Sequence, residues 1–414
     1  MPKPAPLAAS AFDVEAIRRQ FPILSRKVHG KPLVYLDNAA SAQKPAAVLD
    51  ALTNAYSETY ANVHRGVHAL STESTLLFEQ ARERVRAYIN APTLDEVVFT
   101  KGGTEAINLV ASGLAETIGD GDEIVVSEME HHSNIVPWHF LRERNGAVLK
   151  WVPVTADGSF DLDAFARLLT PRTKIVAITH MSNVLGTVTP VAEIVRLAHA
   201  AGAVVLIDGC QGSVHQRVDV QALGCDFYVG TGHKLYGPSG IGFLYGRMEH
   251  LAAMRPYQGG GEMIDTVTKD WVTYGAPPHR FEAGTPPIVP AIGLGVALDW
   301  LGRLDMAEVA AHEHALLEHA TEALEAIPGL SIMGKAPGKG ALVSFVVDGI
   351  HASDMSAVLD RYGIAVRAGS HCAQPLMDRF GVPASLRASF ALYNTHEEVD
   401  ALAEGLAKAK TFFA

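Results

Sequence analysis

The chain of 414 residues has only three cysteines, Cys210, Cys225 and Cys372, and they lie far apart. An odd number of widely spaced cysteines builds neither a disulfide framework nor a four-ligand zinc site. We therefore expect a reducing compartment, the cytoplasm, and no bound metal.

Long apolar runs are also missing. The first 12 residues contain no hydrophobic stretch of signal-peptide length. The most apolar segment, 288–301, is interrupted by Pro290, Gly293, Gly295 and Asp299, and it is shorter than the roughly 20 residues needed to cross a bilayer. We expect neither export nor a membrane span, and we interpret 288–301 as a buried helix.

Basic residues do not predominate, because 34 Lys and Arg stand against 45 Asp and Glu, a formal net charge of -11. An acidic surface repels nucleic acid and anionic membranes, so neither is expected as a partner. Hydrophobic residues make up 48% of the chain and charged residues 19%, which is typical of a globular protein. The length favours a large domain plus a smaller one.

Short β-rich runs alternate with helix-length amphipathic segments from about residue 95 to 245. This pattern predicts an α/β fold whose large domain has a mainly parallel, seven-stranded sheet covered by helices. The predicted strands span 96–99, 123–127, 148–153, 174–179, 204–208, 226–229 and 241–245. Ligands bind beyond the carboxyl ends of such strands, where polar residues gather in this sequence.

A Gly- and Pro-rich region and a helical stretch at 306–326 precede the last hundred residues. Strands predicted at 330–333, 342–347 and 386–390, with helices at 353–362 and 396–410, indicate a smaller α+β C-terminal domain. We predict an N-terminal segment over 1–30 that packs on the small domain, a large domain over 31–290, and a small domain over 291–414 that carries Cys372.

Lys234 lies in a turn of small residues just after an apolar strand. A lysine near a turn is usually a solvated surface group, but two other features favour a catalytic role. Another apolar strand ends at Asp208, and a buried acid requires a cationic partner. The turn Gly102-Gly103-Thr104 presents backbone N–H groups at the positive end of a helix, where phosphate binds. An imine-forming lysine, an acid for a ring nitrogen and an anion cup together predict pyridoxal phosphate.

Three further side chains each allow two interpretations. His131, which precedes His132, either caps a helix or stacks on the cofactor ring, and the neighbouring features favour stacking. Cys372 lies beside His371 and near arginine, and cationic neighbours favour a nucleophilic thiolate; the alternative, an inert packed cysteine, is our interpretation of Cys225 and Cys210. Arg387, in an apolar strand, binds either a substrate carboxylate or an internal Asp or Glu.

These features resemble the group II cysteine desulfurases of the SufS type, within the fold-type I pyridoxal-phosphate enzymes. The resemblance runs nearly end to end and includes the Asp208, Lys234 and Cys372 motifs. Its other segments are 35–40, 63–68, 131–132, 182–186, 280–286 and 393–400. The resemblance implies an enzyme that moves sulfur from L-cysteine onto Cys372, releases L-alanine and supplies iron-sulfur cluster assembly.

The resemblance also implies roles for individual residues. Lys234 holds pyridoxal phosphate through an imine and removes the substrate's α-proton, while Asp208 bonds the ring nitrogen and Gln211 the ring hydroxyl. His131 stacks on the ring and takes part in proton transfer. The phosphate is held by Gly103, Thr104, Thr231, His233 and, from the other subunit of a homodimer, Thr285; the substrate is held by Arg387, Asn183, Ala39 and Arg367.

The sequence departs from the family pattern at two places. Ser370 precedes His371 where the family usually has a second histidine, or glutamine in the related Csd branch. The phosphate turn lacks a second threonine that many relatives have, so we expect one hydroxyl contact fewer. A SufE- or SufU-like sulfur acceptor is the partner that the resemblance implies. Selenocysteine lyase, an aminotransferase or epimerase of the same fold, and a non-catalytic sulfur carrier remain as alternatives.

Overall fold

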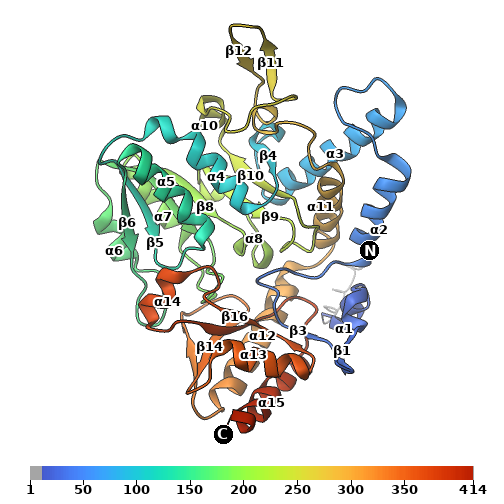
Figure 1. Cartoon of the computed structure of the whole chain (residues 1–414), viewed down its shortest axis with the longest axis vertical. Coiled ribbons are helices and arrows are strands. Elements are labelled where there is room, and N and C mark those ends of the chain that lie inside the picture. The colour runs from blue at the N-terminus through green and yellow to red at the C-terminus, as the bar shows by residue number, and fades with distance from the viewer. Residues whose placement is uncertain (1–11, 414) are drawn as a thin grey trace, which may run out of the picture.

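A computed structural model describes residues 12–413 and shows a large domain above a smaller C-terminal one (Figure 1). The large domain is built on a seven-stranded sheet of order β4-β10-β9-β8-β7-β5-β6. Its strands are β4 (Val97–Thr100), β5 (Glu123–Ser127), β6 (Val148–Val152), β7 (Thr173–Thr179), β8 (Val204–Asp208), β9 (Phe227–Thr231) and β10 (Gly242–Gly246). All seven predicted strands are present, with ends that differ from the prediction by at most two residues.

The sheet is mainly parallel, as predicted. Strands β6, β5, β7, β8 and β9 run parallel to one another, whereas β10 runs antiparallel to both β4 and β9. Every residue of β4, β5, β9 and β10 is buried. Strands covered on both faces read as continuous apolar runs, which explains why the sequence revealed them.

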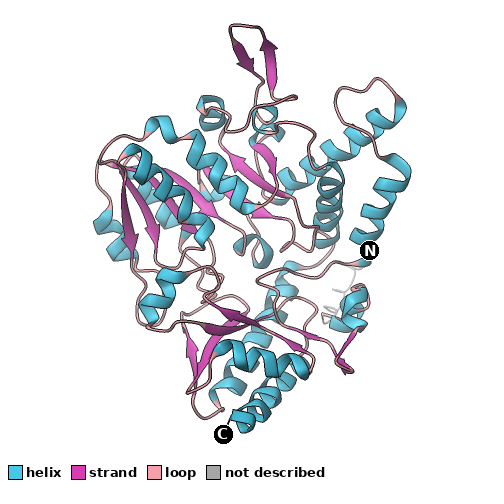
Figure 2. Cartoon of the chain, in the orientation of Figure 1, coloured by secondary structure: helices cyan, strands magenta, loops and turns pink. Residues whose placement is uncertain are grey.

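Helices cover both faces of this sheet (Figure 2). The helices of the large domain are α2 (Ala46–Asn54), α3 (Ala69–Tyr88), α4 (Gly103–Gly113), α5 (Val136–Asn145), α6 (Leu162–Leu168), α7 (Val191–Ala200), α8 (Gly212–His215), α9 (Val220–Leu223), α10 (Met248–Ala253) and α11 (Ile288–Leu301). Helix α11 is buried along most of its length against α2 and α3, as its hydrophobicity on all sides predicts. None of the helices within residues 12–413 is long and apolar enough to span a bilayer.

The small domain packs helices on one antiparallel sheet of order β13-β14-β17-β16. Its elements are α12 (Met306–Glu325), β13 (Leu330–Met333), β14 (Leu342–Val347), α13 (Ala352–Arg361), β15 (Ile364–Ala365), β16 (Arg367–Gly369), α14 (Gln374–Phe380), β17 (Ser385–Ser389) and α15 (His396–Phe413). The sequence did not predict β16, a strand of three residues that leads into the Cys372 loop.

The N-terminal part of the described chain connects the two domains. It contains α1 (Val14–Arg18), η1 (Pro22–Ser25), β1 (Lys27–Val28), β2 (Lys31–Pro32) and β3 (Val34–Tyr35). Strand β3 pairs with β15, and Arg18 donates to Glu398 of α15 at 2.9 Å. Part of the predicted segment 1–30 lies outside the described residues. The predicted division at 290 falls inside α11, and we group this helix with the large domain because it packs on α2 and α3.

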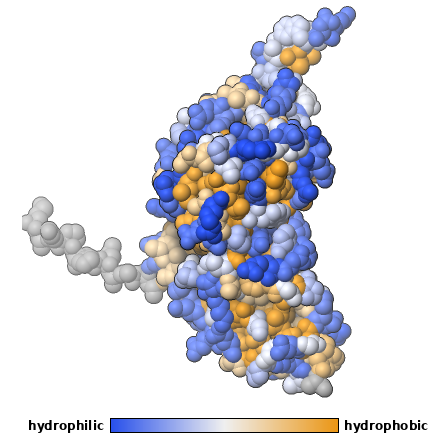
Figure 3. All heavy atoms as spheres, turned by 90° about the vertical axis from the view of Figure 1, so that its left-hand side faces the viewer, coloured by the Kyte–Doolittle hydropathy of each residue, from blue (hydrophilic) through white to orange (hydrophobic). Residues whose placement is uncertain are grey.

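A hairpin of β11 (Ile264–Val267) and β12 (Val272–Tyr274) projects from the large domain, on the side away from the small domain (Figure 1). Its side chains Val267, Trp271, Val272 and Tyr274 are exposed. No strand was predicted in this Gly- and Pro-rich region, which interrupts the alternation of strands and helices. Viewed from the side, the hairpin extends well beyond the surface, and hydrophobic residues are visible at the surface of both domains (Figure 3).

Candidate functional site

A cavity of about 200 Å³ lies where the carboxyl ends of three central strands face the small domain. Thr179, Asp208 and Thr231, the last residues of β7, β8 and β9, line it. The other predicted residues that line it are Ala39, Gly103, Thr104, His131, Asn183, Gln211, His233, Lys234, Arg367, Cys372 and Arg387. The structure thus brings together every predicted site residue except Thr285, which is exposed in the loop before α11.

The turn before α4 forms one end of the cavity. Gly102 has φ +155° and ψ 179°, a backbone region that essentially only glycine adopts. Helix α4 begins at Gly103, so its first N–H groups and its positive dipole end lie at the cavity. The hydroxyls of Thr104 and Ser133 are hydrogen-bonded at 2.7 Å, and both side chains line the cavity. This end is suited to a phosphate group.

Lys234 follows β9 within the cavity wall. Burial lowers the pKa of its amine, an effect that Cys210 and Asp208 oppose and Arg387 reinforces. A lowered pKa favours the neutral amine, which is the form that attacks a carbonyl carbon and accepts a proton. Oδ1 of Asp208 accepts a hydrogen bond from the backbone N–H of Cys210 at 3.0 Å, which fixes the carboxylate at the end of β8.

His131 meets the capping interpretation of the paired histidines, and stacking on a cofactor ring remains a prediction. Its Nδ1 accepts a hydrogen bond from the backbone N–H of Ser133 at 3.1 Å and so caps the short helix η5 (His132–Asn134). The same ring lines the cavity. Burial first, and then the nearby charge of Lys234, lower the pKa of His131 to about 4. The ring is therefore neutral at physiological pH, with its proton on Nε2 because Nδ1 is an acceptor.

The Cys372 loop connects β16 to α14 in a tight left-handed turn. His371 and Cys372 have φ values of +53° and +56°. Two bonds from the large domain hold this turn: the N–H of His132 donates to the Cys372 carbonyl at 2.6 Å, and the Asn183 amide donates to the His371 carbonyl at 2.8 Å. The Cys372 side chain itself is exposed and lines the cavity. The structure therefore supports an accessible thiol and not an inert one.

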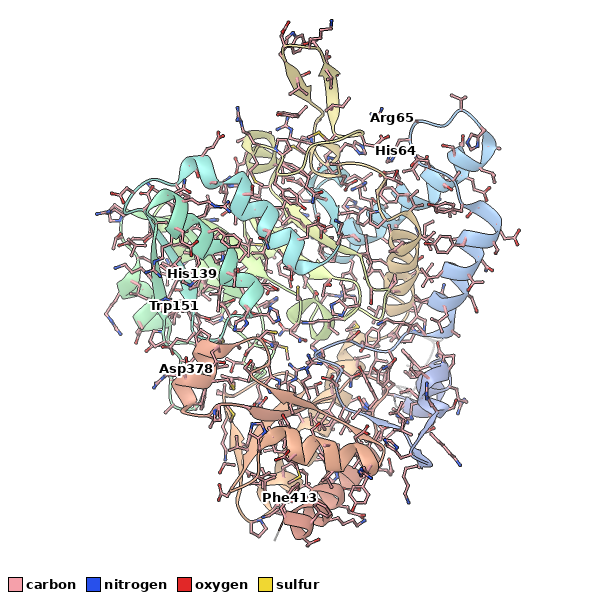
Figure 4. The ribbon with its side chains drawn as sticks, viewed as in Figure 1. His64, Arg65, His139, Trp151, Asp378 and Phe413 are labelled. Carbon is pink, nitrogen blue, oxygen red and sulfur yellow. The ribbon has the colours of Figure 1, made fainter. Side chains whose placement is uncertain are left out.

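Helix α14 follows the Cys372 loop and lies close to the large domain. In Figure 4 its residue Asp378 lies on the side of the molecule that also carries His139 of α5 and Trp151 of β6. Helix α14 is tied to the large domain, because Arg379 donates two bonds to the carbonyl of Val154, at 3.0 and 3.2 Å. The thiol-bearing loop is thus braced at both ends.

His371 does not provide the positive charge that the sequence analysis expected beside Cys372. Burial and the charge of Arg387 lower the pKa of His371 to about 3, so the ring is neutral. Its Nε2 lies 2.9 Å from the Ser385 hydroxyl in β17. The ring anchors the loop, and the cationic neighbours of the thiol are Arg387 and Arg367.

Arg387 makes an internal ion pair, the alternative considered from the sequence, and still faces the cavity. Its Nη2 lies 3.2 Å from Oδ1 of Asp37, and its Nη1 donates to the Asn183 carbonyl at 2.7 Å. Its buried Nε has no hydrogen-bond partner within the described chain. Burial lowers the pKa of Arg387 and raises the pKa of Asp37. The guanidinium is only partly compensated and remains able to bind an anionic group.

Four residues of the site were missed as functional positions. Asp37 pairs with Arg387, Ser133 lies beside Thr104, Cys210 lines the cavity, and Glu130 buries its carboxyl under the His131 turn. Glu130 accepts from Asn134 at 2.7 Å and from the backbone of Thr179 at 3.1 Å. Sequence signals that could have placed them here were available for Cys210, two residues after Asp208, for Ser133, two residues after His131, and for Asp37, within the segment 35–40.

The two remaining cysteines have the properties of unreactive thiols. Burial raises the pKa of Cys210 well above its usual value and that of Cys225 to about 12. Within residues 12–413 we find no group of three or more His, Cys, Asp or Glu arranged to hold a metal ion.

The donors of the cavity fit pyridoxal phosphate. A helix N-terminus and hydroxyls lie at one end, an amine of lowered pKa and a carboxylate lie in the middle, and a neutral imidazole lies against them. These are the groups that this cofactor requires for its phosphate, aldehyde, ring nitrogen and ring face.

Comparison with known proteins agrees with this arrangement. The Aminotransferase class-V family matches residues 34–402. A cysteine desulfurase of Klebsiella pneumoniae is 53% identical over 397 residues, which cover 95% of this chain and 98% of the relative. The crystal structure of the cysteine desulfurase CsdA from Escherichia coli, described as an S-sulfonic acid, has a TM-score of 0.91 and 43% identity, covering 97% of this chain and 100% of CsdA. A C-DES variant with glycine covalently linked to its pyridoxal-phosphate cofactor has a TM-score of 0.81 and 25% identity, covering 94% of this chain and 98% of C-DES.

Proposed function

Because the chain belongs to the class-V aminotransferase family and is a pyridoxal-phosphate-dependent cysteine desulfurase, we propose that Lys234 binds the cofactor and that Cys372 receives the sulfur. The observation that supports this assignment is that one cavity is lined by the amine of Lys234, the carboxylate of Asp208 and the thiol of Cys372. Cys372 is the only exposed cysteine among the described residues.

The cofactor, when bound, supplies an electron sink for carbanion chemistry at the substrate's Cα. Lys234 would hold it covalently, Asp208 would keep its ring nitrogen protonated, and Gln211 would bind its ring hydroxyl. The Gln211 amide donates to the Ala39 carbonyl at 2.7 Å, which fixes its orientation. The phosphate contacts come from α4, beginning at Gly103, with Thr104, Thr231 and His233.

The substrate's carboxylate binds Arg387, whose partly compensated charge attracts an anion. Asn183, Ala39 and Arg367 complete this end of the cavity. Arg367 is more exposed than Arg387, with its Nη1 3.7 Å from Oδ2 of Asp37.

Protein groups then move protons and one sulfur atom. Nζ of Lys234 takes the proton from the substrate's Cα, since burial favours its neutral form. Sγ of Cys372, as thiolate, attacks the substrate's sulfur; an S–S bond forms, the substrate's Cβ–S bond breaks, and its electron pair stays with the carbon fragment. This fragment takes up two protons, one at Cα that Lys234 returns and one at Cβ that balances the proton lost by the Cys372 thiol, which gives L-alanine and leaves a persulfide on Cys372.

The persulfide requires an acceptor, and a SufE- or SufU-like protein that feeds iron-sulfur cluster assembly fits this role. The exposed position of Cys372 is suited to transfer between proteins. A reducing cytoplasm fits three free cysteines. Assignment to the SufS type is also part of this proposal, because Ser370 stands where that type usually has a histidine.

A homodimer completes the site in this proposal. Thr285 is exposed and does not line the cavity of its own chain, so its proposed phosphate contact is made in the other subunit. The exposed apolar hairpin of Val267 and Trp271 is a surface that a partner would cover. His64 and Arg65 lie on the same end of the large domain (Figure 4), and Arg65 pairs with Glu262 at the base of the hairpin at 2.8 Å.

The test is to incubate the purified cofactor-loaded protein with L-cysteine and a thiol acceptor and to quantify alanine and protein-bound persulfide. Cys372→Ser should keep the visible cofactor band and lose the persulfide, whereas Cys225→Ser, a buried cysteine outside the cavity, should retain both. Lys234→Ala should lose the imine that borohydride reduces. Persulfide formation at the parent rate in Cys372→Ser would refute the assignment, and release of selenium without Cys372 would favour the lyase.

A further inference from the structure

The turn Gly102-Gly103-Thr104 predicted one hydroxyl fewer at the phosphate end of the cavity than many relatives have. The structure has a second hydroxyl there. Ser133, at the middle of η5, brings a second hydroxyl to this place from another segment of the chain. Its Oγ lies 2.7 Å from Oγ1 of Thr104, and both residues line the cavity together with Thr231. Two hydroxyls therefore lie side by side at the start of α4.

The structure also explains why position 103 has no side chain. The backbone of Gly103 has no left-handed φ, so its conformation does not require glycine. A Cβ at this position would instead collide with Sγ of Cys210, and it would also press on Cγ1 of Val229 at 3.4 Å. Cys210 is held in place, since its N–H donates to Asp208 at 3.0 Å. Cys210 thus fills the space that a side chain at position 103 would need.

From these contacts we infer that Ser133 is a phosphate-binding residue of this enzyme, supplying the hydroxyl that the Gly103 turn lacks because Cys210 occupies its space. The inference rests on the proposed function, since it takes the Thr104 end of the cavity as the phosphate site. A hydroxyl next to a phosphate donates a charge-assisted hydrogen bond, which is stronger than one between neutral groups.

Ser133 can be tested without disturbing His131. The bond to Nδ1 of His131 comes from the backbone N–H of Ser133, and alanine retains it. Ser133→Ala therefore removes the hydroxyl alone. A hydrogen bond to a charged group contributes roughly 1.5 kcal/mol or more, so affinity for pyridoxal phosphate should fall about tenfold.

The experiment is to titrate apoprotein with pyridoxal phosphate and, separately, with pyridoxal, and to follow the visible imine band. Ser133→Ala should weaken binding of pyridoxal phosphate about tenfold and leave binding of pyridoxal unchanged, because pyridoxal has no phosphate. Ser133→Thr should bind as the parent does. Ser331→Ala, an exposed serine in β13, is the matched control and should change neither affinity.

A second set of variants tests the space-filling role of Cys210. Gly103→Thr should bind pyridoxal phosphate poorly because of the collision with Cys210, and Gly103→Thr combined with Cys210→Ala should recover binding. In that double variant, loss of the Ser133 hydroxyl should cost less than about threefold, because the hydroxyl introduced at position 103 would replace it.

The outcomes separate this inference from the function on which it rests. If the parent binds pyridoxal phosphate tightly and Ser133→Ala binds it equally well, Ser133 is not a phosphate ligand and the desulfurase proposal stands. An equal loss for pyridoxal and pyridoxal phosphate would also overturn the inference, because it would show a general change of cavity shape. A parent that forms no imine band with either compound would overturn the proposed function itself.

Discussion

The ion pair between Asp37 and Arg387 allows a prediction with two opposite effects. Nη2 of Arg387 lies 3.2 Å from Oδ1 of Asp37, and the side chains are 3% and 18% exposed. Burial raises the pKa of Asp37 and lowers the pKa of Arg387 despite their attraction. Both shifts have the same meaning: removing these two charges from water costs more than their attraction returns.

Removing one of the two charges should therefore lower the free energy of unfolding by more than the small net contribution of the ion pair suggests. At 3.2 Å and an effective dielectric constant of about 20, the attraction is about 5 kcal/mol, and breaking a buried pair by removing one charge costs about 3–5 kcal/mol. Asp37→Asn keeps the shape and one acceptor oxygen, and Arg387 keeps its bond to Asn183. We expect the lower end, a loss of about 3 kcal/mol in the free energy of unfolding.

The same change should improve substrate binding. Arg387 without its internal carboxylate binds the carboxylate of L-cysteine more strongly, so KM should fall while the protein becomes less stable. Urea unfolding and steady-state alanine release measure the two effects. Asp400→Asn, which removes an exposed partner of His319, is the control and should change stability by less than about 0.5 kcal/mol. An Asp37→Asn variant as stable as the parent, or one with a raised KM, would refute the reasoning.

Two further predictions concern Glu130 and the dimer. Burial raises the pKa of Glu130 from 4.5 to about 8. Between these pH values the folded chain retains a proton on Glu130 that the unfolded chain releases. The contribution of this proton to the free energy of unfolding is complete below pH 4.5 and is lost as the pH rises through about 8. Glu130→Gln should flatten the decline in unfolding free energy between about pH 5 and 8 in urea titrations, and an unchanged slope would contradict this. Mixed dimers of Lys234→Ala and Thr285→Ala subunits should keep one parent-like site, since the subunit with the intact Lys234 receives the intact Thr285 of its partner while the other site carries both changes; mixed dimers with no parent-like site would show that Thr285 acts within its own chain.

The elements that the sequence predicted best are those in which burial and local pattern agree. Strands β5 and β8 are apolar runs that end in polar residues, and both were predicted without error at either end. Helix α11 was likewise predicted over its full length. The hairpin of β11 and β12 was missed because its strands are short and exposed, within a segment rich in glycine and proline that resembles a loop.

Within the site, the sequence predicted which residues converge but not how they pair. Lys234, Asp208 and Thr104 follow strands of one sheet, so topology alone places them at one edge. Asp37 and Arg387 are 350 positions apart in the sequence, and no local pattern could reveal their contact. The neutral state of His371 was missed for the same reason, because it depends on burial and on the charge of Arg387.

Burial decides which charges of the cavity remain available to a ligand. It lowers the pKa values of His131 and His233 to about 4, and that of His371 to about 3, so all three imidazoles are neutral at physiological pH. It also favours the neutral amine of Lys234. The cations that remain are Arg387, only partly compensated by Asp37, together with Arg367 at one end, and the positive end of α4 at the other. In a chain with a net charge of -11, the cavity thus attracts anions at two separate places, which matches a phosphate and a carboxylate held apart with neutral bases between them.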